Sequence, residues 1–180
     1  MDRGAVAHQA ASGCVMGEAH TRLGEVLVNA GLLDREMLAA ARTTQAQHKL
    51  RLIEVLISYH HIPEVQITQT ISNQLSVAWV SLDHVQFTPE LLRWVPEGLP
   101  VRHGLLPVHF RRDEQSREIL YVAMADPTDV QAMRDVSAYA NTNVRPMIAT
   151  PSELRRAIRT HYGEPSDPGG QRAPHPPFLL

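Results

Sequence analysis

The chain has 180 residues, of which 43% are hydrophobic and 20% charged, and its net charge is −2. A charge this close to zero argues against electrostatic attraction to nucleic acid or to an anionic membrane. The single cysteine excludes an intrachain disulfide and indicates a reducing compartment, so we expect a cytoplasmic protein. No apolar run approaches the ~20 residues of a membrane span, so we expect no membrane insertion.

Residues 1–20 are rich in alanine and glycine and lack the continuous apolar core of a secretory signal. We therefore expect them to form a flexible leader.

Residues 22–45 contain apolar side chains at helical spacing, which predicts two short helices joined by a turn. Thr21 stands where the first helix needs an N-cap, and Asp34 is expected to cap the second. Gly31 lies between them, where a helix commonly ends in a left-handed residue that glycine adopts at low cost.

This segment repeats 29 residues later, because residues 51–74 align with 22–45 without a gap. The identical pairs are Arg22/Arg51, Leu23/Leu52, Glu25/Glu54, Val26/Val55, Leu27/Leu56 and Gln45/Gln74. Repeated helix pairs bury their apolar faces against one another. The repeat therefore predicts four helices, at residues 22–30, 35–47, 51–60 and 64–75, in a subdomain over residues 21–75.

Residues 76–163 alternate between β-rich and helical patterns. We expect a strand at 77–80, a helical turn that begins at Thr88, a hairpin of strands 105–111 and 119–125, a helix from Val130, and a strand at 144–149. The sequence from Thr150 to Glu153 is a capping box that starts a last helix. The fold class is therefore α+β (mixed α/β): a four-helix tandem repeat packed with a small sheet subdomain. Residues 164–180 are rich in proline and glycine, and we expect disorder there.

No signature of a catalytic or metal site occurs. The phosphate loop GxxxxGK[ST], the GxSxG and HExxH motifs and zinc-type Cys/His spacings are all absent from the sequence. His60 and His61 are adjacent, and side chains at adjacent helical positions diverge by roughly 100°, so they would rarely share a metal ion. Asp126, at a strand end, is expected to cap the following turn rather than to act as an acid or base. We expect no enzyme activity, no metal and no cofactor.

The pattern RLGxxLxxxGxLxxxxLxxAxxxQ, present over residues 22–45, resembles the N-terminal regulatory domain of type II secretion and type IV pilus assembly ATPases. The resemblance runs from about residue 21 to 163 and includes LLPVHF, ILYVAMADPTD and the final HYG. In the MshEN branch of that family, two such tandem motifs bind cyclic di-GMP. The resemblance thus implies a cyclic di-GMP ligand and, as partner, a secretion or pilus ATPase or a membrane-platform protein.

The ligand contacts that the resemblance implies are Arg22, Leu23, Gly24, Gly31, Leu38, Gln45, Arg51, Leu52, Ile67, Ile71 and Gln74. Arg42 stands where leucine is usual, and Ile53 and His60 replace the two glycines of the second motif, so we expect the first repeat to contribute more. The two motif arginines are expected to open their helices, where a phosphate would meet free N–H groups. Gly24 allows either close approach of a ligand or a tight contact between helices.

Two functions are compatible with this sequence. The first is a non-catalytic signalling module that binds cyclic di-GMP and relays it to a secretion-type or pilus-type machine. The alternative is an adaptor that docks on a partner protein without any nucleotide. An undetected enzyme is disfavoured, because no catalytic constellation is found.

Overall fold

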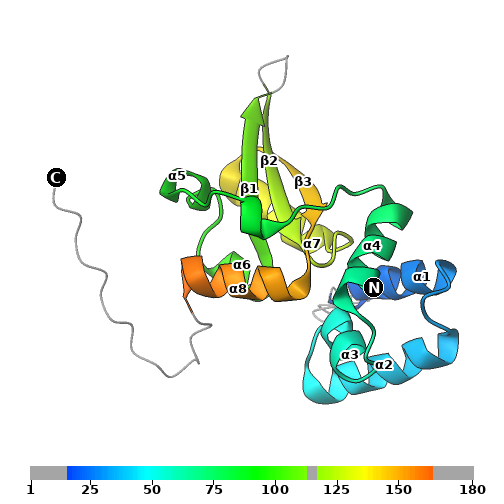
Figure 1. Cartoon of the computed structure of the whole chain (residues 1–180). Helices are drawn as coiled ribbons and strands as arrows, with labels where there is room; N and C mark the ends of the chain where they lie inside the picture. Colours follow the sequence, from blue (N-terminus) through cyan, green and yellow to red (C-terminus); the bar gives the residue numbers. More distant parts are fainter. Residues whose placement is uncertain (1–15, 113–116, 164–180) are drawn as a thin grey trace, which may run out of the picture.

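The computed structural model describes residues 16–112 and 117–163, which form a helical half and an α/β half (Figure 1). The expected leader lies outside the described residues up to residue 15, and so does the expected tail from residue 164. No helix in these described ranges is long and apolar enough to cross a membrane.

The helical half contains the four expected helices: α1 (Met16–Asn29), α2 (Arg35–His48), α3 (Leu52–Ser58) and α4 (Glu64–Leu75). Asp34 caps α2 as predicted, because its Oδ1 accepts a hydrogen bond from the Met37 amide at 2.6 Å. The N-cap predicted at Thr21 is wrong. α1 begins at Met16, so Thr21 and Arg22 both lie inside the helix and Arg22 does not open it.

The turns that end α1 and α3 differ between the two repeats. Gly31 is left-handed (φ +72°) as predicted, and the Leu32 amide donates to the Leu27 carbonyl at 3.0 Å, which closes the end of α1. In the second repeat the left-handed residue is His61 (φ +54°), one position beyond the one aligned with Gly31. A histidine adopts this conformation less readily than glycine but more readily than most residues.

The α/β half is built on a three-stranded sheet in the order β1-β2-β3. The predicted hairpin is confirmed as β1 (Leu105–Arg112) antiparallel to β2 (Glu118–Met124). The helix α7 (Val130–Ala140) then carries the chain across to β3 (Asn143–Ile148), which runs parallel to β2. The strand expected at 77–80 is reduced to a single bridge between Trp79 and Ile148, beside β3.

Helices cover both faces of this sheet. One face packs against α7, and the core between them contains Val95, Leu99, Leu105, Leu120, Val122, Met124, Ala132 and Val136. The other packs against the last helix, α8 (Pro151–Tyr162), with Leu82, Leu106, Val108, Ala123, Ala149, Leu154, Ala157 and Ile158. Thr150 caps α8 as predicted: its hydroxyl oxygen accepts from the Glu153 amide at 3.4 Å.

Three short helical segments connect the halves: η1 (Leu82–His84), α5 (Pro89–Leu92) and α6 (Gly98–His103). The expected turn after Thr88 is α5, whereas α6 was not predicted from the sequence. The two halves meet where α4 packs on β3. The carboxylate of Glu64, at the start of α4, accepts hydrogen bonds from the backbone amide and the hydroxyl of Ser152 on α8.

Candidate functional site

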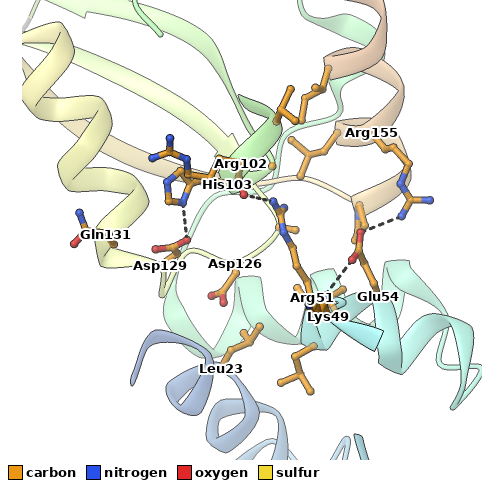
Figure 2. Close-up of a pocket in the computed structure, with 18 of the residues that line it drawn as sticks. Leu23, Lys49, Arg51, Glu54, Arg102, His103, Asp126, Asp129, Gln131 and Arg155 are labelled. Atoms are coloured by element: carbon orange, nitrogen blue, oxygen red, sulfur yellow. Dashed lines mark hydrogen bonds and ion pairs between the residues drawn. The ribbon is translucent and has the colours of Figure 1, made fainter. Parts of the chain in front are cut away.

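A cavity of about 890 Å³ lies between the helical half and the α/β half (Figure 2). Five segments that are distant in the sequence form its wall: α1, the start of α3, the end of α6, the loop between β2 and α7, and α8. Its lining residues include Leu23, Lys49, Arg51, Leu52, Ile53, Glu54, Arg102, His103, Gly104, Asp126, Asp129, Arg155 and Arg159.

Arg51 crosses the cavity from the helical half to the α/β half. It is the N-cap residue of α3, so the predicted place of this arginine at the start of its helix is confirmed. Its Nη2 donates a hydrogen bond of 2.7 Å to the carbonyl oxygen of Arg102 (Figure 2). The guanidinium lies so close to Gly104 that a Cβ there would be 1.8 Å from Nη1. Only a residue without a side chain leaves room for this arrangement.

The carboxylates around the cavity already have structural partners. Glu54 accepts from the Arg51 amide at 3.1 Å and lies 3.5 Å from Arg155 Nη2. Asp129 caps α7 through the Ala132 amide at 2.9 Å and contacts His103 Nδ1 at 3.2 Å. These bonds fix the orientation of the wall.

Asp126 caps the turn that follows β2, as predicted. Its Oδ1 accepts from the Thr128 amide at 2.9 Å and from the Thr128 hydroxyl at 2.6 Å. This side-chain to backbone bond is typical of aspartate at a turn, and it holds the loop between β2 and α7 against the cavity.

Cationic side chains outnumber carboxylates on the cavity wall. The cations on the wall are Lys49, Arg51, Arg102, Arg155 and Arg159, and the carboxylates are Glu54, Asp126 and Asp129. The apolar part of the wall includes Leu23 and Leu52, one from each repeat. The arrangement suits an anionic ligand, because the cations attract its charge, while the two leucines are only 1% and 2% exposed and form the floor of the wall.

The resemblance implied eleven ligand contacts, and in the structure these residues fall into three groups. Leu23, Arg51 and Leu52 come together on the cavity wall, although the two leucines also belong to the buried core of the helical half. Gly24, Leu38, Ile67 and Ile71 are buried inside the helical half. Arg22, Gly31, Gln45 and Gln74 lie elsewhere, fully or partly exposed.

Gly24 serves a contact between helices. A Cβ at this position would lie 2.6 Å from Leu38 Cδ1, so the missing side chain lets α2 approach α1. In the second repeat Ile53 takes the equivalent position and is only 4% exposed. Ile53 belongs to the apolar core of the helical half and also lines the cavity.

Arg22 lines a second, smaller hollow of about 530 Å³, together with Glu25, Pro127 and Thr128. The loop between β2 and α7 separates this hollow from the cavity, since Ala125, Asp126 and Asp129 line the cavity. The two motif arginines therefore face two different hollows on either side of one loop.

Sequence reasoning missed the contribution of the α/β half to the site. The spacing of Arg155 and Arg159 places both on one side of α8, which indicates a cationic stripe. Nothing in the sequence indicated that this stripe, or the end of α6, faces the helical repeats, because that juxtaposition arises only from the packing of the two halves.

Comparisons with known proteins agree with this architecture. The family model of the MshEN domain matches residues 75–168, just over half of the chain. The type IV pilus assembly ATPase PilB of Myxococcus xanthus is 28% identical over 143 residues, which cover 79% of this chain and 24% of the relative. PilB of Thermus thermophilus is 30% identical over 155 residues, which cover 83% of this chain and 17% of the relative.

The chain thus spans a quarter or less of the length of these relatives. Among solved structures, that of MshE with cyclic di-GMP (cdg) has a TM-score of 0.58 and 25% sequence identity. The likeness covers 78% of this chain and 99% of the MshE chain. The family match and the shared mixed α/β fold establish that this chain belongs to the family of MshEN domains.

Proposed function

We propose that this chain is a regulatory module that binds cyclic di-GMP in the cavity between its two halves. The observation that carries the proposal is that Leu23 and Leu52, one from each repeat, and the motif arginine Arg51 line one cavity. The chain is similar to MshE, whose structure was solved with this dinucleotide.

Size and charge support this ligand. A volume of about 890 Å³ lies within the roughly 300–1,000 Å³ typical of small-molecule sites. Among the described residues, five cationic side chains and three carboxylates line the wall, a surplus of two positive charges. Cyclic di-GMP carries two negative phosphodiesters, so its charge matches that surplus. The planar Arg51 guanidinium suits either a phosphate or the face of a guanine.

Five of the other motif residues have one of two roles. Gly24, Leu38, Ile67 and Ile71 pack the helices that present the cavity-lining residues. Arg22 is placed to meet the part of an elongated ligand that reaches past the loop between β2 and α7, in the second hollow.

The relatives suggest what the module controls. Because they are pilus assembly ATPases that extend well beyond this chain, we propose that the module relays ligand binding to such an ATPase or to a platform protein of the same machine. In that role it would work in the cytoplasm and would carry no catalytic centre of its own. The alternative, a nucleotide-independent adaptor, predicts the same fold but no binding of the dinucleotide.

Calorimetric titration with cyclic di-GMP tests the proposal, with GTP and cyclic di-AMP as controls. We expect saturable binding of cyclic di-GMP alone. Arg51→Ala is expected to weaken binding at least tenfold, because a charge-assisted contact is worth about 1.5–3 kcal/mol. Arg22→Ala, the matched change in the first repeat, is expected to weaken it as well if the ligand spans both hollows.

A greater loss of affinity in Arg51→Ala than in Arg22→Ala would locate the ligand in the cavity. Circular dichroism of each variant checks that the fold is retained. If folded wild-type protein shows no saturable binding at high micromolar ligand, the sensing function is wrong and the adaptor takes its place.

A further inference from the structure

We propose that α8 supplies a second anion-binding wall to the cavity through Arg155 and Arg159, so that the bound ligand holds both halves of the chain at once. This inference rests on the proposed binding of cyclic di-GMP. It adds residues that lie outside the tandem repeats, and it gives the ligand a way to act on the arrangement of the two halves.

The helix α8 places two arginines on the wall of the cavity. Arg155 and Arg159 are four residues apart, so they lie one above the other on one side of the helix. Both line the cavity, together with Leu154 and Ile158, which anchor that side of α8 in the core of the α/β half. The two arginines therefore stand on a fixed support in the wall of the cavity that Arg51 and Lys49 also line.

Arg155 forms an ion pair with Glu54. Its Nη2 lies 3.5 Å from Glu54 Oε1, and the two side chains are 61% and 31% exposed. An ion pair this long and this exposed contributes little stability. A phosphate offers the guanidinium shorter, bidentate bonds. A phosphodiester in the cavity can therefore replace Glu54 Oε1 as the partner of Arg155. Glu54 Oε2 would still accept its hydrogen bond from the Arg51 amide.

The cavity and the hollow beside Arg22 differ in the number of cationic side chains that line them. The hollow beside Arg22 is bounded by Leu75, Val77 and the loop between β2 and α7, and Arg22 is the one cation among its lining residues in the described part of the chain. The cavity beside Arg51 has the α8 wall in addition. The second repeat, whose motif departs more from the family pattern, thus faces the more cationic surface.

A ligand bound to Arg51 and to α8 links the start of α3 to a helix of the other half. At present this side of the junction is held by the Arg51–Arg102 hydrogen bond and the Glu54–Arg155 pair. Occupation of the cavity would add charge-assisted bonds across the same gap. The distance and orientation between the halves would then depend on the ligand.

The test compares the full chain with the double variant Arg155→Gln/Arg159→Gln by calorimetric titration with cyclic di-GMP at one salt concentration. Arg156→Gln is the matched control. Like each of the two substitutions, it removes one positive charge from α8, but Arg156 pairs with Asp83 and does not line the cavity. Hydrogen exchange of α8 amides with and without ligand is the second readout.

We expect the double variant to bind at least tenfold more weakly and the control to bind like the wild type. We also expect the ligand to slow exchange in α8 of the wild type and not of the double variant. Wild-type affinity in a folded double variant would overturn the inference and leave the proposed function standing. Absence of binding to the wild type would remove both.

Discussion

Gly104 has a left-handed backbone, with φ +63°, and lies directly against the Arg51 guanidinium. Gly31 is also left-handed, with φ +72°, but no atom would meet a Cβ there within 4 Å. The backbone cost of a side chain is therefore similar at the two positions. Only at Gly104 would the side chain also displace a neighbour, and that neighbour is the arginine on which the proposed site depends.

Gly104→Ala is expected to lower the free energy of unfolding by about 2 kcal/mol or more, because a left-handed alanine costs roughly 1–2 kcal/mol and the overlap with Arg51 adds to it. The variant is also expected to weaken cyclic di-GMP binding, since Arg51 must move. Gly31→Ala is the control, with a loss of roughly 1 kcal/mol and unchanged binding. Urea unfolding and calorimetry measure both quantities. Equal losses of stability in the two variants would show that the Arg51 contact is readily relieved.

Helix caps show which elements the sequence could predict. Asp34 and Thr150 act as caps, because a short side chain just before an apolar helical pattern is a strong local signal. Thr21 fits the same pattern and is not a cap, because α1 continues upstream to Met16. The short helix α6 escaped prediction because its six residues include Gly98 and Pro100, both poor helix formers.

Tyr162 ties the end of α8 to α5. Its hydroxyl donates a hydrogen bond of 3.0 Å to the Leu92 carbonyl. Burial, together with the nearby charge of Glu97, raises the pKa of Tyr162 above that of a free tyrosine. Above a pH of about 10 an unfolded tyrosine loses its proton while Tyr162 in the folded chain keeps it. The unfolded state then binds fewer protons, so this residue makes stability fall as the pH rises.

Tyr162→Phe is expected to cost about 1 kcal/mol at pH 7, through the lost hydrogen bond. Between pH 7 and pH 11 the gap to the wild type is expected to shrink by roughly 0.5 kcal/mol, a reduced value because the side chain is partly exposed to water. Tyr139→Phe, at a residue that is 57% exposed, serves as the control. Urea midpoints at the two pH values measure the gap, and a gap that stays constant or widens would contradict this account.

At the scale of the whole molecule, the sequence predicted the two halves but not how they meet. Periodicity and the internal repeat are local signals, so they revealed the helices and the hairpin. The cavity depends on contacts such as Arg51 with Arg102, which are 51 positions apart. The family resemblance, which is based on the repeats, indicated Leu23, Arg51 and Leu52 as site residues. The contribution of α6 and α8 to the cavity wall could be identified only from the packed structure.

Ile148 couples the two halves through the apolar core. It ends β3, yet its side chain is fully buried in the apolar core of the helical half. Ile148→Ala is expected to cost about 2–5 kcal/mol, as for other large-to-small changes in a core. Because the side chain belongs to the sheet and fills the bundle, we expect the loss to appear in both halves.

The two tryptophans, Trp79 and Trp94, lie in the α/β half, whereas far-UV circular dichroism reports helices of both halves. For the wild type, urea unfolding followed by tryptophan fluorescence and by circular dichroism is expected to give one coincident transition. In Ile148→Ala both curves are expected to move to lower urea together. Two separate wild-type transitions, or a variant in which only the fluorescence curve moves, would show that the halves unfold independently, because a core shared between them cannot be lost from one half alone.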